Sequence, residues 1–567
     1  MRARLFFAIL IVLGIVHSVV VINSFDGRDV VSGIYYAHVV GDSVRFVPQT
    51  GDPITTVKKV GSGNSIFLIE SKSNPVYAGL DVLLINNGNS VEAYKSEEPY
   101  RTNLELAKKS GAKRFILVSP SYGYAAVSVL PYAKLTKSYL LFATKDNFDS
   151  LKETLQNAEG ILIYGYVDEE VEKGLAEMGK TYEKINTGDK YGDNVEIVKK
   201  YFSLNPSKKQ AILTDGNFLE DSIVAGDDPV IFIAMLIPDE TYRYIKAEVE
   251  GGQLSVGLVV GEEYAQSAYN LKKRINNELG GNKFSVLVKM GQSIPAMGSN
   301  LLPLDIFVLP GPVVSLSIKE ANYNDNTKSI EVVYKNSGNA YGYFKSSSFV
   351  YVGGKYLSTV GDSEAIGIKP GEEKGVRYTV EIPPEMEGEI VMNTTVIYGA
   401  SSKTFDNGFN SVFSVGRARY EDVSSVLIEE AVYDSEKDEL SAKIRNNGPV
   451  DAYFLFSTEY VENGQKTTIE DDNVYELKEG ESKVVKMSNL LLKDPKSAQM
   501  KVKVRYGART AFLDKTAEKE VSILEGGVPL WLILLFLLLL ALVIYFVWKK
   551  RKEERGGPVY RGRGIGL

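Results

Sequence analysis

Three loops of this chain combine hydroxyl, carboxylate, amide and tyrosine side chains directly after short apolar runs. The runs end at Ile22, Val118 and Leu213, and their continuous aliphatic composition is typical of parallel strands covered on both faces. Ligands of α/β sheets bind at the carboxyl ends of such strands. The candidate ligand-binding residues are therefore Ser24, Asp26, Arg28 and Asp29 in the first loop, Ser121, Tyr122 and Tyr124 in the second, and Asp215 and Asn217 in the third.

The residue types in these loops fit a carbohydrate ligand. Ser, Asp, Asn and Arg side chains can hydrogen-bond to sugar hydroxyls, and Tyr122 or Tyr124 can stack on a sugar ring. The same residue types also cap helices and close tight turns, so a purely structural role for the loops is the competing interpretation.

The composition argues against several kinds of catalytic and metal site. The chain has no cysteine and only two histidines, His17 and His38, which removes Ser-His-Asp, Cys-His and multi-histidine zinc sites. The acidic runs Glu220-Asp221 and Asp227-Asp228 lack the ligand spacing of a calcium loop and show no glycosidase pattern. A third run, Glu470-Asp471-Asp472-Asn473, lies in a predicted loop and has the oxygen ligands for Ca²⁺, but a solvated loop is the favoured interpretation. We predict no catalytic residue, no metal site and no cofactor.

The formal net charge of −7 argues against a nucleic-acid partner. Without cysteine, stability outside the cell would depend on packing and not on disulfides. Glutamine is scarce whereas lysine and glutamate are common, which is typical of hyperthermophile proteins. The composition predicts an acidic hyperthermophile protein, and the layout of the chain, with an apolar segment near its C-terminus, resembles that of an archaeal surface protein.

Both ends of the chain carry targeting patterns. A basic n-region precedes the apolar run Leu5–Val16, which predicts a signal peptide over residues 1–18. Val528–Trp548 is uncharged and long enough to cross a bilayer core, and the basic tail 549–567 follows it. The sequence therefore predicts a single-pass protein of the cell membrane, in contact with the lipid bilayer through Val528–Trp548. Its ectodomain would be extracellular and its tail cytoplasmic.

After the signal, strand-like runs alternate with helical segments, and the pattern repeats. Tyr100–Lys109 lines up with Tyr191–Lys200, including an Asn-x-Glu in each segment. Both copies lead through a helix into an apolar strand. Matching segments that end in a second strand begin at Ser32, Ser128 and Ser222. We predict three repeated Rossmann-like α/β units, which together form a head.

Alternating strand patterns with polar turns replace the helices in the second half of the chain, and these also repeat. Ile318–Tyr323 matches Ile428–Tyr433, and the turn Asn336-Ser337-Gly338 matches Asn446-Asn447-Gly448. Two tandem immunoglobulin-like sandwiches are expected. Asn393-Thr394-Thr395 is a sequon for N-linked glycosylation within a predicted strand of the first sandwich.

The predicted fold class is multidomain: an α/β head of three repeated Rossmann-like units, two all-β immunoglobulin-like sandwiches and one transmembrane helix. The predicted boundaries are 19–306 for the head, 307–416 and 417–524 for the sandwiches, and 528–548 for the transmembrane helix.

The head resembles the cell wall-binding repeat 2 family. The resemblance rests on Tyr100-Arg101-Thr102 with the following Leu104–Ala107, and on Ala125–Ala133 followed by Ser138–Phe142. It implies three repeats packed as a compact trimer of α/β lobes that tether surface-layer and other surface proteins to anionic envelope polysaccharide. The sandwiches resemble adhesion-type immunoglobulin-like modules of prokaryotic surface proteins, which act as spacers.

These patterns together predict a non-enzymatic surface protein for envelope attachment or adhesion. The expected partners are envelope polysaccharide or surface-layer proteins, with self-association as a further possibility. Two alternatives remain open from the sequence: a tethered receptor for a soluble sugar or peptide, and a hydrolase of surface glycans.

Overall fold

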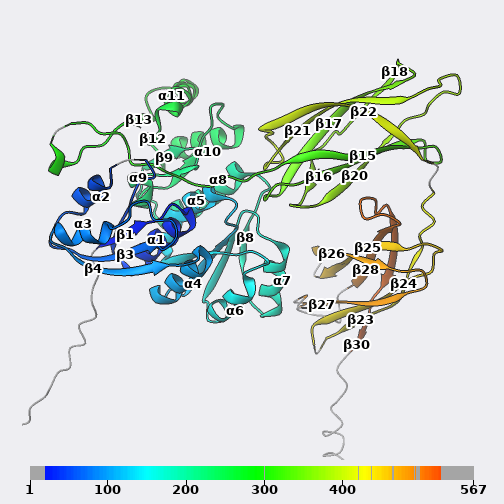
Figure 1. The fold of residues 1–567 in the computed structure, drawn as a ribbon, viewed down its shortest axis with the longest axis horizontal. Helices are drawn as coiled ribbons and strands as arrows, with labels where there is room; N and C mark the ends of the chain where they lie inside the picture. The colour runs from blue at the N-terminus through cyan, green and yellow to red at the C-terminus, as the bar shows by residue number, and fades with distance from the viewer. Residues whose placement is uncertain are drawn as a thin grey trace, which may run out of the picture. The chain divides into compact units, whose positions relative to one another are not determined.

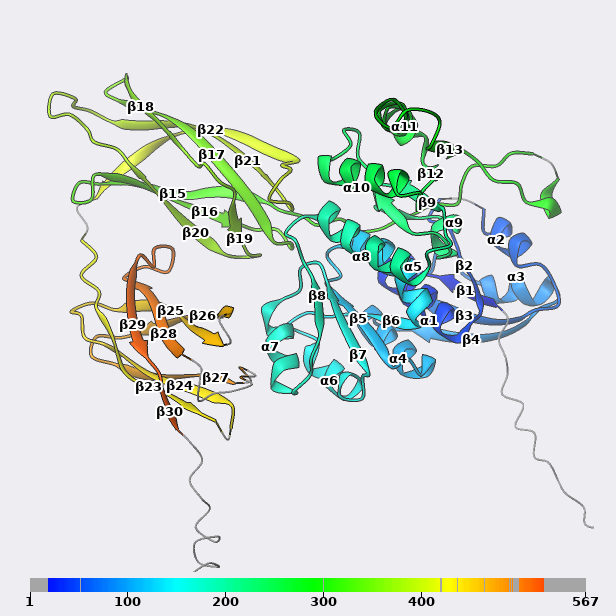
Figure 2. The same ribbon diagram turned by 180° about the vertical axis from the view of Figure 1, so that it is seen from behind.

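The computed structural model describes residues 19–50, 52–298, 300–418, 421–435, 437–462, 465–488, 490, 492 and 499–524. The chain divides into two compact parts, Met1–Glu421 and Asp422–Leu567. The first part holds an α/β head and a first β region, and the second part holds a second β region (Figure 1; Figure 2 shows the same ribbon from behind).

The head contains three four-stranded parallel sheets with the same strand order. The orders are β2-β1-β3-β4, β6-β5-β7-β8 and β11-β9-β12-β13. The first unit consists of β1 (Val19–Asn23), α1 (Gly27–Val40), β2 (Ser43–Phe46), α2 (Pro53–Val60), β3 (Ser65–Ser71), α3 (Leu80–Asn86) and β4 (Ser90–Ser96). Its central strand β1 is buried along its whole length, as expected of a strand covered on both faces.

The second and third units each begin with an additional helix. The second consists of α4 (Pro99–Ser110), β5 (Arg114–Val118), α5 (Gly123–Thr136), β6 (Ser138–Phe142), α6 (Phe148–Gln156), β7 (Gly160–Tyr164), α7 (Glu169–Glu177) and β8 (Glu183–Ile185). The third consists of α8 (Lys190–Leu204), β9 (Gln210–Thr214), β10 (Phe218–Leu219), α9 (Asp221–Val224), β11 (Val230–Phe232), α10 (Asp239–Glu250), β12 (Val256–Val260), η1 (Glu262–Tyr264), α11 (Ala265–Leu279) and β13 (Ser285–Lys289). After η2 (Pro295–Met297), the strand β14 (Phe307–Val308) pairs antiparallel with β10.

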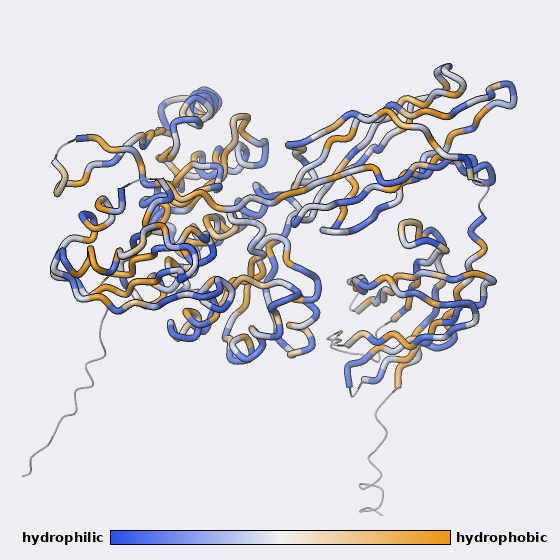
Figure 3. Tube along the Cα trace, viewed as in Figure 1, coloured by the Kyte–Doolittle hydropathy of each residue, from blue (hydrophilic) through white to orange (hydrophobic). Residues whose placement is uncertain are grey.

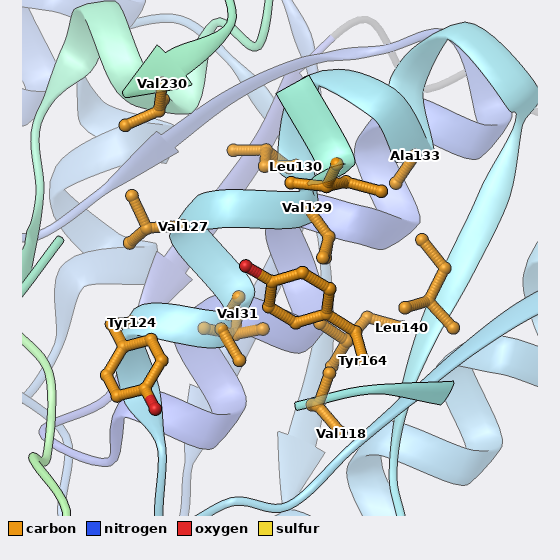
Figure 4. Close-up of a cluster of buried hydrophobic side chains, with 14 of the residues drawn as sticks. Val31, Val118, Tyr124, Val127, Val129, Leu130, Ala133, Leu140, Tyr164 and Val230 are labelled. Atoms are coloured by element: carbon orange, nitrogen blue, oxygen red, sulfur yellow. The ribbon is translucent and has the colours of Figure 1, made fainter. Parts of the chain in front are cut away.

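Helix α5 lies at the centre of the head and is apolar on nearly every face. Val127, Val129 and Leu130 of this helix are almost completely buried. Figure 4 shows them among Val31 of α1, Leu140 of β6 and Val230 of β11, side chains from all three units. The three units therefore share one hydrophobic core and do not pack as independent domains.

An asparagine from each additional helix closes the open edge of a sheet. β6 and β11 are edge strands, so their outward backbone groups need partners. The Nδ2 of Asn103 in α4 donates to the Leu140 carbonyl at 3.0 Å, and its Oδ1 accepts from the Phe142 N–H at 3.0 Å. Asn194 in α8 repeats both bonds with β11, at 2.9 Å to Val230 and 2.8 Å to Phe232.

The same two asparagines connect neighbouring units. Asn103 also donates to the Ser32 hydroxyl of α1 at 2.9 Å, and Asn194 donates to the Ser128 hydroxyl of α5 at 2.7 Å. Each amide therefore joins the central helix of one unit to the sheet of the next. The Asn-x-Glu repeat and the repeated serines of the sequence are the two halves of this contact.

The β-rich remainder of the first part consists of antiparallel strands, with one parallel pair between β15 and β22. Its strands are β15 (Leu316–Asn324), β16 (Ser329–Asn336), β17 (Gly342–Val352), β18 (Lys355–Gly361), β19 (Ile366–Ile368), β20 (Glu373–Thr379), β21 (Ile390–Gly399) and β22 (Asn407–Ala418). β22 pairs with both β21 and β15 and so joins the two halves of the region. Figure 3 shows hydrophobic and hydrophilic stretches following one another along these strands, the pattern of sheets with one buried face.

The second β region has two four-stranded sheets around a core of its own. Its strands are β23 (Val426–Asp434), β24 (Glu439–Asn446), β25 (Ala452–Glu462), β26 (Gln465–Leu477), β27 (Ser482–Ser488), β28 (Gln499–Gly507), β29 (Lys515–Glu520) and β30 (Ser522–Leu524). The repeated Asn-x-Gly turns serve the same purpose in both regions. Asn336 accepts from the Gly338 N–H at 3.0 Å, and Asn446 accepts from the Gly448 N–H at 3.0 Å.

The predicted localisation requires correction. Across the part of the chain that the structure describes, no helix combines the length and the apolar character needed to cross a membrane. A single-pass membrane protein is therefore not supported. Val528–Trp548, on which that prediction was based, lies outside the described residues, as do the predicted signal 1–18 and tail 549–567.

The asparagine contacts generate a stability prediction. Asn103→Ala or Asn194→Ala should each lower the free energy of unfolding by about 3 kcal/mol, because a buried N–H and a buried carbonyl lose their partners. Guanidinium unfolding of the purified protein measures the loss. Asn157→Ala is the matched control, since Asn157 is exposed and makes one 3.3 Å bond to the Glu153 carbonyl. Equal losses in all three variants would contradict this account of the sheet edges.

Candidate functional site: a tyrosine cleft

A cleft of about 220 Å³ lies at the carboxyl ends of three strands of the second unit. Tyr122 and Tyr124 follow β5, Tyr166 follows β7 and Asn186 follows β8. The opposite wall comes from the first β region, which contributes Tyr341, Tyr343 and Ala400. The site thus occupies the position where parallel α/β sheets bind ligands, and a second domain completes it.

Five tyrosine rings form a continuous row in the wall of this cleft. The ring centroids of Tyr124 and Tyr122 are 5.8 Å apart, and those of Tyr122 and Tyr166 are 6.2 Å apart. Tyr166 lies 5.1 Å from Tyr341, which lies 5.1 Å from Tyr343. The row begins on the head and ends on the first β region, so both contribute to one aromatic surface.

Most of the tyrosine hydroxyls in the cleft are free for a ligand. The Tyr122 hydroxyl accepts from the Tyr341 N–H at 2.9 Å. The hydroxyls of Tyr124, Tyr166, Tyr341 and Tyr343 have no hydrogen-bond partner among the described residues. Burial raises the pKa of Tyr166 and raises that of Tyr341 to about 12. These phenols therefore stay neutral and keep their protons available for donation.

Several direct contacts hold the first β region against the head around the cleft. Asp189 Oδ1 accepts from the Ser401 hydroxyl at 2.7 Å, and its Oδ2 accepts from the Gly192 N–H at 3.0 Å. Asp189 thereby caps α8 and binds the neighbouring region at once. Ion pairs of Lys369 with Glu169 at 3.0 Å and of Lys403 with Glu240 at 2.6 Å lie beside it.

Gly192 explains a difference between the two repeated segments. It occupies the position of Arg101 in the first copy. A Cβ on Gly192 would lie 2.4 Å from the Thr187 hydroxyl oxygen, closer than the packing beside Asp189 allows. The second copy therefore needs glycine where the first carries an arginine.

Asp193 is the most strongly perturbed carboxyl group of the cleft. Its side chain is buried, and its Oδ1 accepts from the Thr187 N–H at 2.5 Å. Burial raises its pKa to about 6, and the negative charges of Asp189 and Glu240 add to the increase. The side chain of Thr187 also forms a hydrogen bond with this carboxyl group. Asp193 is thus a buried carboxyl group held by the backbone and the side chain of Thr187.

The other charged groups of the cleft are largely paired. Glu172 accepts from Lys184 at 2.5 Å and from the Tyr182 hydroxyl at 3.1 Å. Lys190 forms no ion pair with a described residue, and its ammonium lies 5.7 Å from the Tyr124 ring centroid. The free groups of the site are therefore phenols and one ammonium, beside the buried carboxyl group of Asp193, and together they suit a polyhydroxylated ligand.

The predicted residues of the first loop are used inside the protein. Asp26 caps α1 through the Arg28 N–H at 2.9 Å and pairs with the Arg28 guanidinium at 2.6 Å. The guanidinium also lies over the Tyr100 ring, at 4.9 Å from its centroid. Asp29 is fully buried, burial raises its pKa, and its carboxylate accepts from Ser24 at 2.8 Å. These contacts match the structural interpretation of the first loop, in which the same residue types cap a helix and close a turn.

The remaining predicted residues also lie outside the cleft. Ser121 is partly exposed, and its N–H donates to the Ser119 hydroxyl at 3.4 Å. Asp215 accepts from the Asn217 N–H at 2.9 Å and from the Tyr264 hydroxyl at 2.8 Å. Asn393 is exposed in β21. Of the predicted ligand-binding residues, the structure brings only Tyr122 and Tyr124 into the tyrosine cleft.

Sequence reasoning missed Tyr166, Asp193, Tyr341 and Tyr343. Tyr166 could have been predicted, because it follows the apolar run that ends at Tyr164, and ligands bind beyond the carboxyl ends of such strands. Asp193 lies inside the repeated helix start, where its equivalent is Thr102. No sequence signal indicates Tyr341 and Tyr343, because they belong to a region expected to act as a spacer.

Metal binding has no support within the described ranges. No group of three or more His, Asp or Glu side chains there is placed to hold a metal ion.

Comparisons with known proteins give little further information. No protein-family model matches the chain, and no curated protein matches it. Cwp8 from Clostridium difficile is similar over 47% of this chain and 48% of its own, with 15% identity and a TM-score of 0.40. Cwp6 from the same organism is similar over 41% and 40%, with 14% identity and a TM-score of 0.33. Red sea bream transglutaminase is similar over 45% of this chain and 34% of its own, with 10% identity and a TM-score of 0.13. This chain thus spans less than half of each of these proteins, and TM-scores this low carry no argument about function.

The raised pKa of Asp193 predicts a pH-dependent stability difference. Because burial raises this pKa from 3.8 to about 6, ionisation costs folded-state stability as the pH rises through that interval. Asp193→Asn should therefore increase the free energy of unfolding at about pH 7.5, by roughly 1–3 kcal/mol, and leave it unchanged below about pH 4.

Urea unfolding at several pH values measures this difference. Asp149→Asn is the control, since the side chain of Asp149 is 90% exposed. A difference between Asp193→Asn and the natural protein that does not vary with pH would contradict the assignment.

Proposed function

We propose that this protein is a non-catalytic surface protein that binds envelope saccharide through the tyrosine cleft. The observation that carries the proposal is the row of five tyrosines, three at the carboxyl ends of β5 and β7 and two on the first β region. Four of their hydroxyls lack a partner among the described residues. Aromatic rings supply rigid surfaces for the C–H faces of sugars, and the phenols and Asp193 supply donors and acceptors for sugar hydroxyls.

The size of the cleft limits what enters it. Its volume of about 220 Å³ is below that of a pocket for a drug-sized ligand, about 300 Å³ or more. A single sugar ring or the end of a polysaccharide chain fits this description better than an internal stretch of polymer.

The sequence supplies the class of ligand. The resemblance of the head to the cell wall-binding repeat 2 family, through Tyr100-Arg101-Thr102, favours envelope polysaccharide as the natural partner. Contacts with surface-layer proteins, or self-association, would then arrange copies of this protein that are already bound to the saccharide. A receptor for a soluble sugar or peptide would use the same cleft. The two functions differ in whether the free ligand or the envelope polymer binds more tightly.

Binding to saccharide fractions from the cell envelope tests this proposal. Tyr166→Ala should weaken binding by about tenfold or more, because it removes a ring from the middle of the row. Tyr343→Phe should weaken binding by about two- to tenfold, because it removes one hydrogen bond and keeps the ring. Isothermal titration with purified polysaccharide and with its monosaccharides measures both effects.

Tyr269→Phe provides the control, since Tyr269 is 55% exposed and does not line the cleft. Equal binding by the natural protein and the Tyr166→Ala variant would rule out the cleft as the binding site. Tighter binding of free monosaccharides than of polymer would favour the receptor over envelope attachment.

A second candidate function, hydrolysis of a glycosidic bond, is favoured by one observation. Asp193 has a pKa of about 6, which suits a general acid at neutral pH. Glycosidases need a second carboxylate on the other side of the bond. Asp189 already accepts from Ser401 and Gly192 with its two oxygens, and Glu172 is paired with Lys184. Binding without hydrolysis therefore fits these contacts better.

Release of reducing ends from envelope polysaccharide separates the two functions. We expect no release above that of a buffer control, and we expect Asp193→Asn to retain binding within about threefold. Release by the natural protein that disappears in Asp193→Asn, while saccharide affinity is kept, would replace the binding function with the hydrolase.

A further inference from the structure

The outer face of the sheet β17-β21-β22 carries an exposed apolar patch. Phe349 of β17 is 49% exposed, Val412 of β22 is 68% exposed and Ile397 of β21 is 41% exposed. Tyr356 of β18, at 55% exposure, extends the patch, with its ring centroid 6.4 Å from that of Phe349. Clustered apolar side chains of this kind on a surface usually have something to cover them.

Asn393 lies in the middle of this patch. It is the register partner of Phe349 across the β17–β21 pair and of Val412 across the β21–β22 pair. Directly opposite residues on neighbouring strands have Cβ atoms about 4.5–5.5 Å apart and lie on the same face. The exposed side chain of Asn393 is thus flanked on both sides by exposed apolar groups.

The amide of Asn393 is free to react. It has no hydrogen-bond partner among the described residues. The hydroxyl that completes the sequon belongs to Thr395 on the same outer face, where it donates to Asn410 at 2.7 Å. The middle residue, Thr394, is buried on the inner face and bonds to Ser348 at 2.8 Å.

We propose that Asn393 carries an N-linked glycan whose first sugar covers Phe349 and Val412. The proposal depends on this outer face alone and is independent of the tyrosine cleft. The C–H face of a sugar ring attached at Asn393 reaches the neighbouring aromatic ring, and the hydroxyl face remains in water. The sequon and the apolar patch then have one explanation.

The attachment is a simple group transfer. The Nδ2 of Asn393 forms a bond to C1 of the first sugar of a lipid-phosphate-linked oligosaccharide. The bond between C1 and the phosphate oxygen breaks, the phosphate leaves with the electron pair, and the amide nitrogen gives up one proton. No oxidant or reductant takes part.

Mass spectrometry of the protein purified from its own cells tests the attachment. The peptide that contains Asn393 should carry the mass of an oligosaccharide. Thr395→Ala should abolish that mass, whereas Thr395→Ser should keep it, because serine also completes a sequon. An unmodified Asn393 peptide in the natural protein would overturn the proposal.

Enzymatic removal of the glycan tests the packing on the patch. In the natural protein, removal should lower the thermal midpoint of the first β region by roughly 4 °C, the shift expected for a modest loss of packing. In Phe349→Ser the same removal should lower it by about half as much or less, because the ring that the sugar covers is absent.

Val484→Ser is the control, because Val484 is 54% exposed in the second β region. In the Val484→Ser variant, glycan removal should lower the thermal midpoint of the first β region as much as it does in the natural protein. Equal shifts in the natural protein and Phe349→Ser would overturn the contact between the sugar and Phe349.

Discussion

The open edges of the parallel sheets are the constraint on which this structure depends. A parallel edge strand presents unpaired N–H and carbonyl groups, and these cannot be buried between two units without partners. Asn103 and Asn194 supply a donor and an acceptor in the spacing that one edge strand requires, and each uses its remaining N–H for a serine of the preceding unit. Because these amides satisfy the edges, three small sheets can share a single core.

The position of the tyrosine cleft follows from this arrangement. Asn194 fixes α8 against β11, and the first turns of the same helix carry Asp189 and Asp193 to the carboxyl end of the second sheet. Asp189 then binds Ser401 of the first β region. One helix therefore sets the packing of the third unit, the carboxyl groups of the cleft and the attachment of the domain that supplies Tyr341 and Tyr343.

The sequence predicted the parts of the structure that are local or repeated. Apolar runs ending at Ile22 and Val118 are buried parallel strands, and the aligned asparagines mark equivalent contacts. Position along a strand was sufficient to place Tyr122 and Tyr124, which line the cleft. Asp26 and Asp29 make internal contacts instead, because capping and ligand binding use the same residue types. Tyr341 and Tyr343 were not predicted, since nothing in a local pattern shows which distant segment will close a cleft.

The contact between the first and third units shows what happens where the asparagine is missing. No helix precedes β1 within the described residues, so the outward Val44 carbonyl of β2 accepts from its neighbour Arg45 at 2.9 Å. Within the third unit, the Lys289 ammonium of β13 bonds to Ser222 at 2.7 Å and to Glu220 at 2.6 Å, so Ser222 has a lysine as its partner where Ser32 and Ser128 have an amide. Lys59 adds ion pairs to Asp221 and Asp305 at 2.6 and 2.7 Å. An amide satisfies a strand edge with one rigid group, whereas this contact needs several long side chains whose ordering costs entropy. Hydrogen-bonded amides thus join the units at two contacts and ion pairs contribute at the third, since within the described residues only the second and third units have a preceding helix that supplies the amide.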